Sequence, residues 1–129
     1  MLAVDTNLIV RYVTRDDRRQ SAVAGRIMRD DSVWISKTVI LETEWVLRGV
    51  YDFPEAEVLD AIEAVLGLPN VTVEDAPAVA RAISWARAGI DLADALHAAS
   101  LGPAKGFVTF DSDLIKQGRR LSLEMIGPA

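Results

Sequence analysis

The chain has 129 residues and a net charge of −5; half of its residues are hydrophobic and 26% are charged, which is the profile of one globular domain with a real core. The absence of cysteine excludes disulfides, thiolate zinc sites and cysteine nucleophiles. No apolar run approaches the ~20 residues of a membrane span, and the N-terminus does not have the pattern of a signal peptide. We therefore expect a cytoplasmic protein without a membrane partner. Because the net charge is negative, a phosphate substrate would need a local basic patch or a bridging metal ion.

Apolar and amphipathic segments alternate along the chain. In chain order we expect a buried strand at 2–4, helices at 6–13 and 17–29, a strand at 33–36, helices at 38–51 and 55–66, a strand at 71–73, helices at 76–88 and 91–101, a strand at 106–110, a short helix near Leu114 and a strand at 122–126. This alternation predicts an α/β fold with a short central parallel sheet flanked by helices on both faces, formed by a single domain over residues 1–129. Sites in such sheets lie beyond the carboxyl ends of the strands, where Asp5 and Asp111 fall.

The first carboxylate of interest lies in the segment LAVDTN at residues 2–7. Asp5 follows three apolar residues, and no Lys or Arg lies within five residues of it. A buried, unpaired carboxylate costs several kcal/mol. We therefore expect either backbone donors or groups from elsewhere in the fold to satisfy Asp5.

Two glutamates share the segment KTVILETEWVLRG at residues 37–49. Arg48 lies four residues after Glu44, an ordinary surface pair that predicts a solvated Glu44. The helical neighbours of Glu42 include no basic residue; they are Val39, Trp45 and Val46. We therefore expect Glu42 to be the carboxylate on an apolar face.

Two further segments carry paired aspartates. In GIDLADALHAAS, Asp91 is placed to cap a helix and Asp94 would lie in the first turn, on the same face. In GFVTFDSDL, Asp111 ends an apolar strand, and Asp113 could cap the helix that follows. Each acid taken alone has a structural explanation.

Four of these acids interrupt apolar segments without a local cation: Asp5, Glu42, Asp94 and Asp111. Converging carboxylates repel one another unless a cation lies among them, and hard oxygen ligands select Mg²⁺ or Mn²⁺. Such a site can lower the pKa of bound water and stabilise charge on a phosphoryl group.

These segments, in this order, resemble the PIN-domain family, most closely its VapC-type toxins of bacterial and archaeal toxin–antitoxin pairs. The resemblance covers nearly the whole chain and is carried by VDTNLIVRYV, ISKTVILETEWVLR, DLADALHAAS and FVTFDSDL. It implies a metal-dependent endoribonuclease that hydrolyses RNA phosphodiester bonds with metal-activated water and uses Mg²⁺ or Mn²⁺. It also implies a homodimer and a heteromeric complex with a cognate antitoxin protein.

The resemblance assigns residues as well. Asp5, Glu42, Asp94 and Asp111 match the family's acidic quartet, as catalytic residues and metal ligands. Accessory positions are Thr6, Asn7, Asp91, Thr109 and Asp113. Thr6 and Asn7 could hold the Asp5 carboxylate by hydrogen bonds, and Thr6 could equally cap a helix.

Basic residues offer a possible RNA contact. Arg11, Arg15, Arg18 and Arg19 form the densest basic run of the N-terminal part, either as a solvated face or as a contact for RNA phosphates. His97, the single histidine, lies three residues after Asp94 and is more often a spectator at such a position. The general base would then be metal-bound hydroxide rather than imidazole.

Other functions remain open at this stage. A phosphohydrolase of the haloacid dehalogenase type would need Asp-x-Asp after its first strand, where this chain has Asp5-Thr6-Asn7. A response-regulator receiver would need paired acids and a later lysine, and neither is evident. A catalytically inactive PIN module that only binds a partner is a further alternative.

Overall fold

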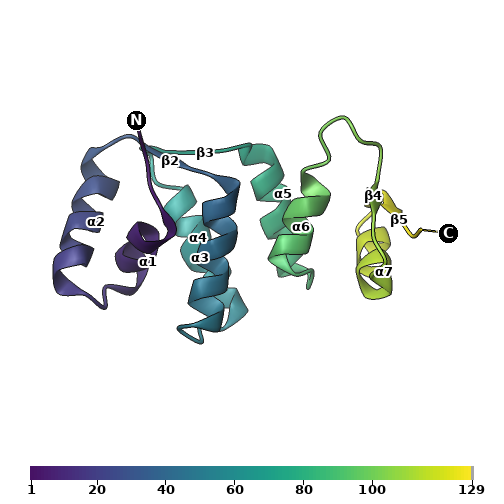
Figure 1. Cartoon of the computed structure of the whole chain (residues 1–129), viewed down its shortest axis with the longest axis horizontal. Coiled ribbons are helices and arrows are strands. Elements are labelled where there is room, and N and C mark those ends of the chain that lie inside the picture. The colour runs from purple at the N-terminus through teal and green to yellow at the C-terminus, as the bar shows by residue number, and fades with distance from the viewer. Residues whose placement is uncertain (129) are drawn as a thin grey trace. The chain divides into compact units, whose positions relative to one another are not determined.

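The structure is a computed structural model that describes residues 1–128. It contains two compact units, one of residues 1–76 and one that begins at Pro77. The mixed α/β fold with parallel strands is confirmed: the described residues form seven helices and five short strands (Figure 1). No helix within residues 1–128 is both long and apolar enough to cross a membrane.

The first unit is built on a parallel sheet with the strand order β1-β2-β3. Its strands are β1 (Leu2–Ala3), β2 (Val33–Ile35) and β3 (Val71–Val73). Central strand β2 is buried at Val33 and Ile35. Strand β1 is at the edge of this sheet and both of its residues are exposed, so the expected buried strand at 2–4 is wrong except at Val4.

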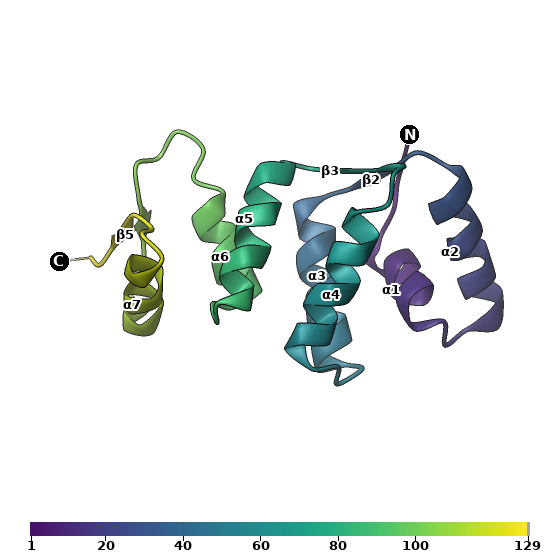
Figure 2. The same cartoon turned by 180° about the vertical axis from the view of Figure 1, so that it is seen from behind.

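Four helices complete the first unit. They are α1 (Thr6–Thr14), α2 (Arg18–Asp30), α3 (Lys37–Gly49) and α4 (Glu55–Leu66). Helices α1 and α2 lie side by side in both views (Figures 1 and 2). Apolar side chains from all four helices are buried and form the core, among them Ile9, Val10, Met28, Leu47, Val58 and Leu59. This core fixes α1 and α3, the two helices that carry Asp5 and Glu42.

The second unit consists of three helices and a strand pair. Its elements are α5 (Ala76–Arg87), α6 (Leu92–Ala99), β4 (Phe107–Val108), α7 (Ser112–Arg120) and β5 (Met125–Ile126). Strand β4 pairs with β5 in parallel, with Phe107 opposite Met125. Gly118 of α7 is buried against Met125, and a Cβ atom at this position would collide with that side chain. The glycine therefore lets α7 pack closely on β5.

The expected elements are present, with small differences at their ends. Helix α3 begins at Lys37 and ends at Gly49, rather than at 38 and 51. The helix near Leu114 extends over nine residues, and the last two strands are shorter than expected.

Candidate functional site

Asp5 is the N-cap of α1. Its Oδ1 accepts a hydrogen bond from the Leu8 backbone N–H at 3.0 Å, and the residue is exposed. Within residues 1–128 its second oxygen has no hydrogen bond. Backbone therefore satisfies one oxygen of this carboxylate and leaves the other for a ligand.

The two polar residues after Asp5 differ from each other. Thr6 is buried, and its hydroxyl has no partner within the described residues, so neither of the roles expected for it, holding Asp5 or capping the helix, is correct. Asn7 is exposed and lines a groove between α1 and α2.

The two glutamates of α3 differ in their burial. Glu44 is only 4% exposed and accepts a hydrogen bond from Arg48 Nε at 2.7 Å, so the expectation of a solvated Glu44 is wrong. Arg48 Nε also lies 3.5 Å from Glu55 of α4, so the pair lies where α3 meets α4. Glu42 is exposed and has no ion pair among residues 1–128, and Trp45, one helical turn later, is exposed as well. Glu42 is therefore the available carboxylate because of its exposure.

The second unit holds two more helix caps. Asp91 is the N-cap of α6 and accepts from the Asp94 N–H at 3.2 Å, as expected. Asp111, and not Asp113, is the N-cap of α7: its Oδ1 accepts from the N–H groups of Asp113 and Leu114, both at 3.0 Å. Thr109 Oγ1 in turn accepts from the Asp111 N–H at 3.1 Å. As at Asp5, only one oxygen of each capping carboxylate is used.

Asp94 is the half-buried acid of this unit. Burial raises the pKa of Asp94, and the charges of Asp91 and Asp111 raise it further, while His97 lowers it. The carboxylates of Asp91 and Asp111 thus lie close enough to oppose the ionisation of Asp94, and a bound cation would relieve this opposition. His97 itself is exposed.

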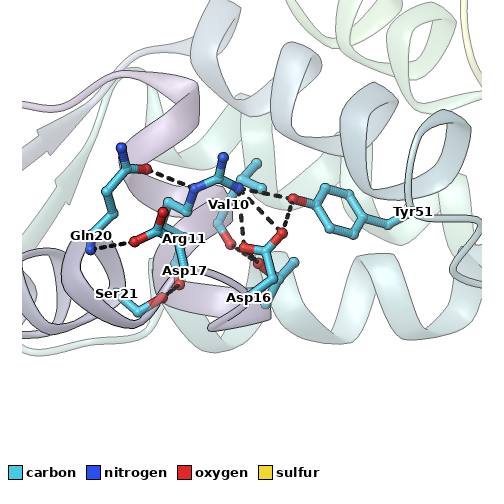
Figure 3. A network of polar contacts seen from close by, with 8 residues as sticks. Val10, Arg11, Asp16, Asp17, Gln20, Ser21 and Tyr51 are labelled. Atoms are coloured by element: carbon cyan, nitrogen blue, oxygen red, sulfur yellow. Dashed lines mark hydrogen bonds and ion pairs between the residues drawn. The ribbon is translucent and has the colours of Figure 1, made fainter.

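Arg11 belongs to a network at the turn between α1 and α2 (Figure 3). Its guanidinium donates to Asp16 at 3.1 Å, to the Tyr51 hydroxyl at 2.9 Å and to Gln20 Oε1 at 2.8 Å. The Tyr51 hydroxyl donates to Asp16 Oδ2 at 2.6 Å. This network ties the turn to Tyr51, which lies two residues after the end of α3, and sequence reasoning missed it. The signal was Asp16 and Asp17, two acids inside the basic run.

The other three arginines of this run are exposed. Arg15 and Arg18 line a groove together with Tyr12, whereas Arg19 lines the groove that contains Asn7. The structure therefore divides the run between two grooves, and Arg11, held in its network, lines the groove of Arg19 as well.

The candidate metal ligands belong to both units. Asp5 and Glu42 lie in the first unit, and Asp94 and Asp111 lie in the second. Among residues 1–128 no group of three or more His, Cys, Asp or Glu is arranged to hold a metal ion. The donor chemistry nevertheless fits a hard divalent cation, since all four donors are carboxylates and two of them keep an oxygen outside their cap bonds.

The comparisons identify the family. A model of the PIN domain matches residues 2–120, a span that includes all four acids. A search among curated proteins found no match. PIN domains are generally nucleases, and PIN-domain nucleases generally use divalent metals. Because the match extends over nearly the whole chain, this protein belongs to the PIN domain family.

Proposed function

We propose that the protein is a metal-dependent endoribonuclease of the VapC toxin type. The observation that carries the proposal is the set of four carboxylates within a matched PIN domain, in which Asp5 and Asp111 each use one oxygen as a helix cap and keep the other free. We further propose that residues 1–129 form one functional domain, in which Asp5, Glu42, Asp94 and Asp111 serve as ligands for Mg²⁺ or Mn²⁺.

Each acid has a separate task in this proposal. Asp5 and Asp111 hold the cation, and their cap bonds fix each carboxylate against the end of its helix. Asp94, whose pKa is raised by burial and by neighbouring acids, gains most from a cation. Glu42, exposed on α3, ligates the cation or orients water. A divalent ion, when bound, supplies the charge that activates water and stabilises the departing oxygen.

The same proposal includes partners. A toxin of this type would be cytoplasmic, would form a homodimer and would be held inactive in a complex with a cognate antitoxin. Expression in a bacterial host would then arrest growth, and co-expression of the protein encoded by the adjacent reading frame would restore it. Asp5→Asn is the matched control, because asparagine keeps the helix cap and removes the charge. Growth arrest by this variant would contradict the toxin mechanism.

The nuclease activity is tested by cleavage of labelled single-stranded RNA. We expect cleavage with Mn²⁺ or Mg²⁺, loss of cleavage with EDTA, and recovery when metal is added back. Asp5→Asn and Asp111→Asn should each abolish cleavage while folding normally. Cleavage that persists in EDTA, or in both variants, would contradict the proposal.

A further inference from the structure

A groove runs between α1 and α2 of the first unit. Asn7 and Leu8 of α1 line one side of it, and Arg19, Gln20 and Val23 of α2 line the other. Its volume is about 310 Å³, at the lower end of the range for ligand pockets. Leu8, one of its lining residues, donates its backbone N–H to Asp5 Oδ1 at 3.0 Å, so the groove lies next to a carboxylate proposed to bind the metal.

Arg19 is the available cation of this groove. Several basic side chains of the first unit are held in ion pairs; these are Arg11, Arg29, Lys37 and Arg48. Within residues 1–128 Arg19 has no ion pair, and it is exposed. Its guanidinium can therefore bind a phosphate without first breaking an internal contact.

Gln20 is oriented by the network of Figure 3. Its Oε1 accepts from Arg11 Nε, so its amide nitrogen remains as a hydrogen-bond donor. Arg11 is in turn held by Asp16 and the Tyr51 hydroxyl. The groove thus combines a fixed amide donor, a free guanidinium and an apolar wall that includes Val23, which is 39% exposed.

We propose that this groove binds the nucleotide next to the scissile phosphodiester in single-stranded RNA. Arg19 contacts its phosphate, the Gln20 amide donates to a base edge, and Leu8 and Val23 contact the base face. Unstacked bases of single-stranded RNA present apolar faces and open hydrogen-bonding edges, which match these three features. The inference rests on the proposed nuclease function, and it separates Arg19 from Arg18, its neighbour in sequence.

An acidic peptide is the competing occupant. The lining favours the nucleotide, because Asn7, Arg19 and Gln20 offer hydrogen-bond donors beside the apolar side chains of Leu8 and Val23. Leu8 is also bonded through its backbone N–H to Asp5. A protein with a net charge of −5 also needs a local cation wherever it binds a polyanion.

The test compares Arg19→Ala with Arg18→Ala. Both residues lie in the first turn of α2 and are exposed, but Arg18 lines the other groove. Binding of a short fluorescein-labelled single-stranded RNA of mixed sequence is measured by anisotropy in EDTA, where no cleavage occurs, over a series of salt concentrations. We expect Arg19→Ala to weaken binding about tenfold, as for a lost charged hydrogen bond, and to reduce the salt slope by about 0.7. Arg18→Ala should stay within about twofold of wild type, and Arg19→Lys should recover part of the loss.

Cleavage with Mn²⁺ separates this inference from the proposed function. Arg19→Ala should raise KM with little change in kcat. The inference would be overturned if the two alanine variants lost RNA affinity equally, or if neither lost any. It would also be overturned if the wild type did not bind RNA, even if the wild type cleaves it. Displacement of the RNA by an acidic peptide but not by unlabelled RNA would also overturn it. If Arg19→Ala bound RNA more weakly than Arg18→Ala but the wild type cleaved no RNA, the result would contradict the nuclease proposal alone.

Discussion

Arg48 Nε donates a hydrogen bond to the buried carboxylate of Glu44 at a distance of 2.7 Å, and the same nitrogen lies 3.5 Å from Glu55. Glu42, two residues earlier on α3, is exposed. The two glutamates therefore have separable roles, one in stability and one in chemistry.

Substitution of these glutamates should separate stability from activity. Glu44→Ala leaves Arg48 without its buried partner and should lower the free energy of unfolding by about 1–3 kcal/mol, with kcat per folded molecule nearly unchanged. Glu42→Gln should leave the free energy of unfolding nearly unchanged and abolish RNA cleavage. Urea unfolding and cleavage assays on the same preparations test both statements. A large loss of stability in Glu42→Gln would show that the assignment is reversed.

Asp5 offers a test of its two roles at one position. Asparagine is as good an N-cap as aspartate, so Asp5→Asn should be as stable as wild type without metal, whereas Asp5→Ala should lose about 1 kcal/mol because the bond to the Leu8 N–H is removed. Both variants should lose cleavage. If Asp5→Asn were several kcal/mol less stable than wild type, the charge of Asp5 would be structural and the metal-ligand reading would be wrong.

Thr43 of α3 is buried with a hydroxyl that has no partner among residues 1–128. Thr43→Val keeps the shape and removes the unsatisfied group, so it should stabilise the protein by about 1–2 kcal/mol. Thr43→Ser keeps the hydroxyl and removes a methyl group, so it should destabilise by about 1 kcal/mol. Thermal unfolding in matched buffers gives both values, and a destabilised valine variant would reveal a partner for the hydroxyl.

Acid unfolding should report on Asp16. Hydrogen bonds from Tyr51, and to a lesser extent from Thr14, hold the pKa of Asp16 below its ordinary value of 3.8. Burial raises this pKa in part, and the charge of Arg11 lowers it further. An acid whose pKa is lowered by folding stabilises the folded state above its unfolded pKa, and this contribution is lost as the pH falls through the folded pKa. Tyr51→Phe should therefore be less stable than wild type at neutral pH, and the difference should shrink below about pH 4.

Tyr12→Phe is the control for this measurement, because the Tyr12 hydroxyl makes no hydrogen bond within the described part of the chain. Its stability should follow the wild-type pH profile. A difference between Tyr51→Phe and wild type that stays constant down to low pH would show that the hydroxyl acts without Asp16.

The local elements and helix caps were largely predictable from the sequence. The alternation of apolar and amphipathic segments located the helices, and Gly89-Ile90 before Asp91 indicated a cap that the structure confirms. For α7 the sequence left a capping role for Asp113 open, because Asp111 and Asp113 are both compatible with the start of the helix. The backbone bonds to Asp111 Oδ1 show that Asp111 is the cap.

The tertiary environments were less predictable. The spacing of Glu44 and Arg48 correctly predicted a pair, but the burial of Glu44 depends on how α3 packs against α4, where Glu55 approaches the same guanidinium. Arg11 was likewise grouped with its basic neighbours in sequence, whereas its partner Tyr51 lies 40 residues away in the chain. Contacts at such separations leave no periodic signal.

The central claim is the proposal that Asp5, Glu42, Asp94 and Asp111 are ligands of a divalent metal. Calorimetric titration of Mn²⁺ into the metal-free protein tests it most directly, using Asp5→Asn, Glu42→Gln, Asp94→Asn and Asp111→Asn, with the exposed Asp52→Asn as the control. We expect each of the four variants to weaken Mn²⁺ binding by at least about tenfold, as for the loss of a charged ligand, and the control to bind like wild type. Unchanged Mn²⁺ affinity in any one of the four variants would contradict the role of that acid, and unchanged affinity in all four would contradict the claim.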